Sequence, residues 1–222
     1  MKSNNKLFLL PVASLFASLS CSASETGKHT INADVWADNW FVLYVAGELI
    51  KEDSVPYKTE RSFNAESFSF DVELPAQLNL VIKDYTEDDT GLEYIGSSRQ
   101  QIGDGGFMAQ FFDAETEELL AVSNEEWRCK AIHQAPLNKS CVRSSNPQSD
   151  CESIVDSQPD DWMNVEFDDS DWPNAIVHSA QAVRPHGGFS RVSWQPTAEL
   201  IWTEDLETDN WLLCRFTITA PN

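Results

Sequence analysis

Hydrophobic and polar residues alternate most strictly over residues 67–74, where the sequence reads SFSFDVEL. Successive side chains of a strand point to opposite sides, so this pattern places two Phe, one Val and one Leu on a single face. Residues 38–50 (DNWFVLYVAGELI) are rich in aromatic and branched residues and contain Gly47. This composition favours a strand, a tight turn and a returning strand.

Further strand-like or anchoring segments follow at the spacing that is typical of a β-sandwich or barrel. They cover residues 30–36, 78–85, 107–113, 119–123, 127–133, 167–172, 190–194, 199–202 and 211–218. Residues 134–159 are instead rich in Ser, Asn, Pro and Asp, which predicts a long surface loop. We therefore expect an all-β protein with one antiparallel β-sandwich domain over residues 24–222.

The first 23 residues have the organisation of an export signal. Lys2 and Lys6 precede an apolar run over residues 7–19, and small residues follow. Because this run is too short to span a bilayer, we expect residues 1–23 to be a cleaved signal peptide. The mature protein would then be secreted, periplasmic or on the cell surface. The alternative is a lipoprotein with a lipid anchor at Cys21.

The charge balance narrows the range of partners. The chain has 36 acidic and 15 basic residues, for a formal net charge of -21. Nucleic acids and anionic membrane surfaces repel such a chain, so we expect neither as a partner. The acidity is compatible with cations or neutral sugars as ligands, and equally with an acidic surface that only maintains solubility.

Four cysteines remain beyond the predicted signal peptide: Cys129, Cys141, Cys151 and Cys214. An even number in an exported chain predicts two disulfides, for which three pairings exist. We favour one bond between Cys141 and Cys151, which closes the polar loop, and one between Cys129 and Cys214, which joins two strands. A site for a soft metal is the competing interpretation, although the sequence contains no CxxC motif.

Several short motifs occur together along the chain. They are residues 37–39 with 41–47 (ADN and FVLYVAG), residues 111–113 followed by Trp127, residues 167–172 (FDDSDW), and residues 198–202 (AELIW) with Arg215. Their order resembles that of the galactose-binding-like β-sandwich family. This resemblance implies a jelly-roll fold, carbohydrate binding and, in many members, a structural calcium ion.

Tryptophan is abundant, with eight residues in the chain. Trp36, Trp40, Trp194 and Trp211 lie on predicted strands or at their ends, where rings could stack on a sugar. They are our candidates for ligand-binding residues. The alternative is that these large apolar rings are buried in the core.

Two groups of acidic residues offer the oxygen ligands that calcium prefers. One comprises Asp84, Glu87, Asp88, Asp89 and Glu93, and the other comprises Asp168, Asp169 and Asp171. Neither group has the spacing of a helix-loop-helix calcium site. A solvated acidic loop is the alternative interpretation.

Histidines provide a second type of candidate metal ligand. Neutral imidazole suits copper and zinc, and His133, His178 and His186 come from segments that could converge. The acidic, exported character is similar to that of surface copper proteins of methane-oxidising bacteria, which use two His and an oxidised Trp. That similarity makes Trp127 a fourth candidate, although dispersed surface His residues are the alternative.

Motifs of nucleophilic, zinc-dependent and nucleotide-dependent enzymes are absent from the sequence. We therefore predict a binding protein without catalytic activity, whose ligand is an extracellular glycan. The first alternative is a surface or periplasmic copper-binding protein with His ligands. The second is a carbohydrate-active hydrolase, because two of the many carboxylates could form an acid–base pair.

Overall fold

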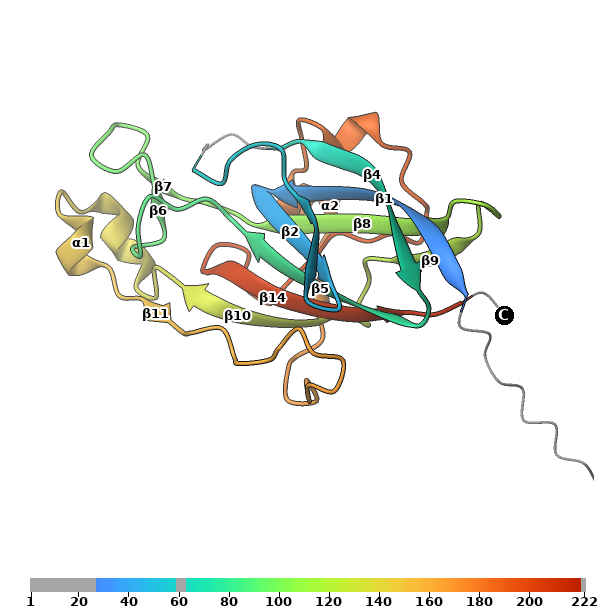
Figure 1. Ribbon diagram of the computed structural model, residues 1–222. Helices are drawn as coiled ribbons and strands as arrows, with labels where there is room; N and C mark the ends of the chain where they lie inside the picture. Colours follow the sequence, from blue (N-terminus) through green and yellow to red (C-terminus); the bar gives the residue numbers. More distant parts are fainter. Residues whose placement is uncertain (1–26, 59–62, 221–222) are drawn as a thin grey trace, which may run out of the picture.

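The computed structural model describes residues 27–58 and 63–220. The predicted signal peptide and the alternative lipid anchor at Cys21 lie outside these residues. The described chain is built mainly from antiparallel strands, as the alternating sequence pattern predicts, and most of them form two sheets (Figure 1). In the described residues, no helix is both long and apolar enough to cross a membrane.

The first sheet has six strands. Its order is β12-β13-β8-β1-β4, and β9 also pairs with β8. The strands are β1 (Lys28–Asp38), β4 (Ala65–Glu73), β8 (Gly106–Asp113), β9 (Leu119–Val122), β12 (Ile176–Val177) and β13 (Ile201–Trp202). Every pairing is antiparallel, so the chain needs only hairpins and loops to connect them.

The second sheet also has six strands, in the order β11-β10-β14-β5-β2-β3. They are β2 (Trp40–Val45), β3 (Glu48–Glu52), β5 (Ala76–Lys83), β10 (Arg128–Gln134), β11 (Ile154–Val155) and β14 (Asp209–Ile218). The hairpin of β2 and β3 is the one that the sequence predicts. Ala46 and Gly47 form its turn, and both have the positive φ that tight hairpins require.

Small elements complete the fold. They are a two-stranded sheet of β6 (Leu92–Glu93) and β7 (Gln101–Ile102), and four short helices: η1 (Lys139–Arg143), α1 (Pro147–Asp150), α2 (Ala180–Val183) and η2 (Phe189–Arg191). Residues 190–194, which were expected to be strand-like or anchoring, form no strand. A 3-10 turn forms there, and the Trp194 indole N–H donates to the carbonyl of Phe189 at 3.0 Å.

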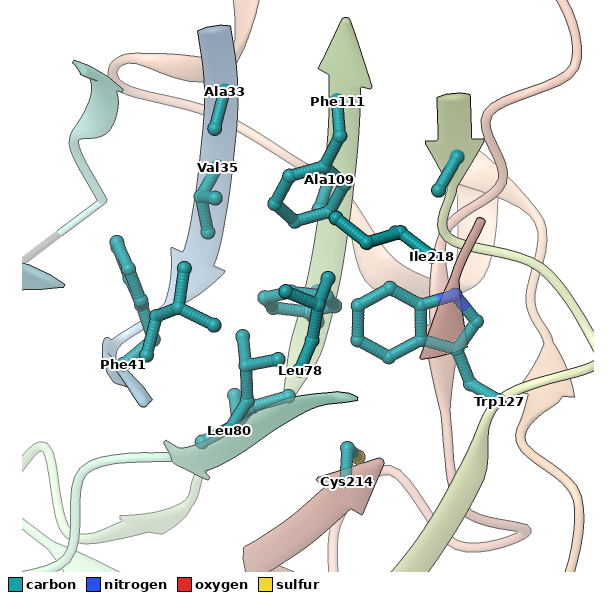
Figure 2. Packing of buried hydrophobic residues seen from close by; sticks show 14 of the residues in the cluster. Ala33, Val35, Phe41, Leu78, Leu80, Ala109, Phe111, Trp127, Cys214 and Ile218 are labelled. Carbon is teal, nitrogen blue, oxygen red and sulfur yellow. The ribbon is translucent and has the colours of Figure 1, made fainter. Parts of the chain in front are cut away.

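The main core lies between the two sheets and takes apolar side chains from both (Figure 2). Val35 of β1 and Phe111 of β8 meet Phe41 of β2 and Leu80 of β5, all fully buried. Strand β4 supplies Phe70 to this core, as its period-two pattern predicts. Burial of these side chains is the main favourable contribution to folding.

A second apolar cluster covers the outer face of the second sheet. Trp40, Val42 and Val81 point away from the main core and pack against Trp162 and Trp172. Those two tryptophans come from the irregular segment that follows β11. Strand β2 is therefore buried on both faces, which explains why its sequence is a continuous apolar run rather than an alternating one.

Both favoured disulfides are confirmed. Cys129 and Cys214 face each other on neighbouring strands β10 and β14, and Cys141 is bonded to Cys151 across the loop that holds η1 and α1. The first bond belongs to the main core. The competing interpretation of a soft-metal site is therefore wrong for these four cysteines.

Candidate functional site

A cleft of about 590 Å³ opens at the end of the sandwich where β1 and β5 end and β8 begins. Four carboxylate side chains line it: Asp38, Asp84, Glu93 and Asp104. Arg184, which follows α2, and the rings of Phe63 and Tyr94 also border the cleft. The described lining residues therefore combine several hydrogen-bond acceptors with aromatic surface and the permanently charged Arg184.

Asp84 is the most deeply placed of the four carboxylates, with 1% of its surface exposed. It directly follows β5, and its Oδ2 atom has no hydrogen-bond partner among the described residues. The loop before β8 passes so close that a Cβ atom on Gly103 would lie 2.5 Å from this oxygen. Glycine at this position therefore makes room for the carboxyl group.

Burial and mutual repulsion raise the pKa of two of these groups. The pKa of Asp84 lies well above its usual range because of burial and then because of the neighbouring Asp38, Glu93 and Asp104. The pKa of Asp38 is raised in the same way, by burial first and then by Asp104 and Glu93. The site therefore holds protons that an exposed aspartate would release.

The other two carboxylates have polar partners at the cleft. An Nη2 atom of Arg184 donates to Asp104 Oδ2 at 2.6 Å, and the Arg184 side chain is 74% exposed. The Gln101 amide donates to Glu93 Oε2 at 2.6 Å, across the β6–β7 pair. Asp104 thus forms an ion pair with Arg184, and the guanidinium of that pair stays in contact with solvent.

The four predicted sugar-stacking tryptophans have different surroundings. Trp36 is fully buried, and its indole N–H lies 3.2 Å from the carbonyls of both Phe63 and His186. Trp194 is half-buried and packs on Phe189. Trp36 therefore has no exposed ring face that could stack on a sugar.

Trp40 and Trp211 meet on the outer face of the second sheet, around the chain's own Lys83. The Lys83 Nζ atom lies 3.8 Å from the ring centroid of Trp211, 4.8 Å from that of Tyr57 and 5.3 Å from that of Trp40. Such a cage stabilises an ammonium group by cation–π attraction. These rings are thus engaged within the protein, although Trp211 remains partly exposed.

The candidate metal ligands do not form a common site in the described part of the chain. His133 is buried, with Nδ1 at 3.2 Å from the Asn210 amide nitrogen. His178 Nε2 lies 2.8 Å from the Thr203 carbonyl oxygen, and His186 Nδ1 lies 3.1 Å from that of Arg184.

Trp127, the fourth candidate, is a core residue. It is fully buried and stacks on Phe216, with 5.2 Å between ring centroids. Over residues 27–58 and 63–220, no group of three or more His, Cys, Asp or Glu is arranged to hold a metal ion. Copper and calcium binding therefore receive no support from this geometry and stay untested predictions.

The second acidic group has a structural partner. Asp169 forms an ion pair with the buried Arg215 at 3.0 Å, and Asp168 caps the turn by accepting from the Ser170 N–H. Arg215 also donates to the carbonyls of Asn164 and Phe167. These contacts hold the irregular segment that follows β11 against the second sheet.

The sequence predicts two of the four cleft carboxylates as candidate site residues. Asp84 and Glu93 belong to the acidic stretch that was considered for calcium, but Asp38 and Asp104 were not among the candidates. Asp38 begins the segment predicted over residues 38–50, and Asp104 lies shortly before the segment predicted over residues 107–113; acidic residues near strand ends are the available signal. Which strand ends meet depends on the order of strands in the sheets, and the local pattern does not contain that information.

Comparison of the chain with protein-family models, curated proteins and solved structures found no match. The galactose-binding-like resemblance therefore stays a prediction.

Proposed function

We propose that this protein binds an extracellular glycan in the carboxylate-lined cleft. The observation that carries the proposal is Asp84, a buried carboxyl group that lines the cleft and whose Oδ2 atom lacks a partner within the described residues. A buried polar atom without a partner costs stability, so such atoms are commonly satisfied by a ligand or by water.

The chemistry of the lining suits a sugar. Sugar hydroxyls are bound by planar polar groups such as carboxylates, amides and guanidinium, while the apolar faces of sugar rings pack on aromatic side chains. Asp104 and Gln101 provide polar groups, and Phe63 and Tyr94 provide rings. The volume of about 590 Å³ lies within the range of small-molecule sites.

The proposed location is outside the cell, in the periplasm or on the surface. The two disulfides support it because such bonds form and persist in oxidising compartments. The sequence pattern of residues 1–23 supports export independently of the disulfides. An acidic surface is compatible with such a setting.

A glycan array followed by calorimetric titration tests the proposal. The wild-type protein should bind at least one class of glycan, and Asp84→Asn should weaken that binding about tenfold or more, because a charge-assisted hydrogen bond is lost. Trp211→Ala distinguishes the sites, since it alters the outer aromatic cage and leaves the cleft intact. Binding that survives Asp84→Asn but disappears in Trp211→Ala would place the glycan on the cage instead.

A carbohydrate-active hydrolase is the second candidate, and the raised pKa of Asp38 and Asp84 favours it. A carboxyl group with a raised pKa is suited to donate a proton as a general acid in glycoside cleavage. Incubation with fluorescently labelled oligosaccharides should then give shorter products, and Asp38→Asn or Asp84→Asn should stop their formation. Intact oligosaccharides after prolonged incubation would leave binding as the function.

A further inference from the structure

The cleft holds many more hydrogen-bond acceptors than charged donors. Asp38, Asp84, Glu93 and Asp104 line it together, and Arg184 is the one permanently charged base among its described lining residues. His186, which also borders the cleft, is exposed and can add a further charge only when protonated. The local charge therefore has the same sign as that of the whole chain, which is -21.

This excess of acceptors discriminates between ligand types. A neutral sugar both donates and accepts through each hydroxyl group, so it has no need for four carboxylates. An anionic sugar would be repelled by them. A bare metal ion requires several ligands that converge on one point, and the described residues contain no such group of three.

We infer that the ligand is an amino sugar with a free primary amine, and that its ammonium group pairs with the carboxyl groups of Asp84 and Asp104 in the cleft. This inference rests on the proposed function, which it makes more specific. An ammonium group offers three N–H donors and a positive charge, whereas its acetylated form offers one donor and no charge. It would give the unpartnered Oδ2 atom of Asp84 a donor and reduce the repulsion among the carboxylates.

The ion pair between Arg184 and Asp104 would compete with a ligand ammonium group for the same carboxylate. Its guanidinium reaches Asp104 at 2.6 Å from the solvent side, because 74% of the side chain is exposed. An exposed ion pair of this kind contributes little stability, so a ligand ammonium can compete for Asp104 at low cost. Arg184 would then be a built-in competitor of the ligand, and its removal should strengthen amine binding. An Arg184 that bound sugar hydroxyls would have the opposite effect.

Titration calorimetry with three matched sugars tests the inference on the full mature chain. The probes are a short glucosamine oligomer, the N-acetylated oligomer of equal length and a glucose oligomer of equal length. We expect the glucosamine oligomer to bind about tenfold or more tightly than the other two, because a charge-assisted contact is lost in both. Arg184→Ala should bind it several-fold more tightly, while Arg143→Ala, which removes an exposed arginine on η1, should leave binding unchanged.

Each other outcome has a distinct meaning. Equal binding of all three oligomers, with no gain in Arg184→Ala, overturns the amine inference and leaves the proposed glycan function standing. No binding of any oligomer by protein with a native circular dichroism spectrum overturns the amine inference, and no binding on the glycan array by the same protein overturns the proposed function as well. Binding of spermidine as tight as that of the glucosamine oligomer overturns the assignment to a sugar. Displacement of the oligomer by sub-millimolar calcium chloride overturns the amine in favour of a metal ion.

Discussion

Replacing Asp84 with asparagine should make the stability of this protein less dependent on pH. The side chain is 1% exposed, and its pKa is raised by burial and by three neighbouring carboxylates. Asparagine has nearly the same shape and does not ionise. The substitution therefore removes one proton-binding group and keeps the packing around Gly103.

The direction of this pH dependence follows from whether the folded or the unfolded state binds the proton of Asp84 more tightly. An aspartate in the unfolded chain has a pKa of about 3.9, whereas folded Asp84 keeps its proton to higher pH. The folded state thus binds more protons than the unfolded state, so this group favours folding at acid pH. Its contribution is lost as the pH rises towards the folded pKa, at about 1.4 kcal/mol per pH unit.

The measurement is the free energy of unfolding in urea at several pH values between about 4.5 and 7.5, where the unfolded carboxyl of Asp84 is ionised. Tryptophan fluorescence and circular dichroism would report unfolding. The difference between variant and wild type isolates Asp84 and its coupling to Asp38, because the remaining carboxylates are common to both proteins. As the pH rises, the free energy of unfolding of Asp84→Asn should increase relative to that of the wild type by up to about 1.4 kcal/mol per pH unit.

A matched control is Asp171→Asn, which changes an exposed aspartate far along the chain from the cleft residues. The same measurements on Asp171→Asn report the effect of removing one exposed carboxylate from the chain. A constant difference for Asp84→Asn would refute the reasoning, because it would mean that folded Asp84 releases its proton as readily as an unfolded aspartate does.

Three further variants test other parts of the structure. Replacing both Cys129 and Cys214 with Ala should lower the free energy of unfolding by about 4.5 kcal/mol, because the disulfide joins residues that are 85 apart in the chain. Urea unfolding measures this loss, and a loss below about 1 kcal/mol would contradict the prediction. Arg215→Met should cost about 3 kcal/mol in the same assay, since it leaves an acidic partner and two backbone carbonyls without their donor; an unchanged midpoint would show that these contacts contribute nothing. Burial raises the pKa of Asp53 to about 6, so Asp53→Asn should become more stable relative to wild type by about 1–2 kcal/mol as the pH rises from about 4 through about 6. Thermal melts across that range measure this, and melting temperatures of variant and wild type that differ by the same amount at every pH would contradict it.

The strands and their buried faces could be predicted from the sequence because they depend on local periodicity. In β4, alternation alone indicates which side of the strand faces the core, and Phe70 lies there. The hairpin of β2 and β3 follows from a run of aromatic and branched residues with a turn at Gly47. The even number of cysteines predicted two disulfides, and the favoured pairing is confirmed.

Local periodicity could not predict which tryptophans are buried. Trp40 lies on the side of β2 that a sandwich strand would normally expose, yet Trp162 and Trp172 cover that side. Trp127 could equally have been a surface residue, but Phe216 and Phe111 enclose it in the main core. Burial of a large ring depends on which distant segment packs over it, and local composition does not specify that segment.

The sequence by itself determined most of the strand pattern, because side-chain periodicity follows from residues close together in the chain, and the even number of cysteines determined that two disulfides could form. Only the tertiary structure decided which carboxylates share a cleft. Asp38, Asp84 and Asp104 meet because the end of β1, the end of β5 and the loop before β8 lie at one end of the sandwich. The order of strands in each sheet sets that proximity, and with it the repulsion and burial that give the cleft its chemistry.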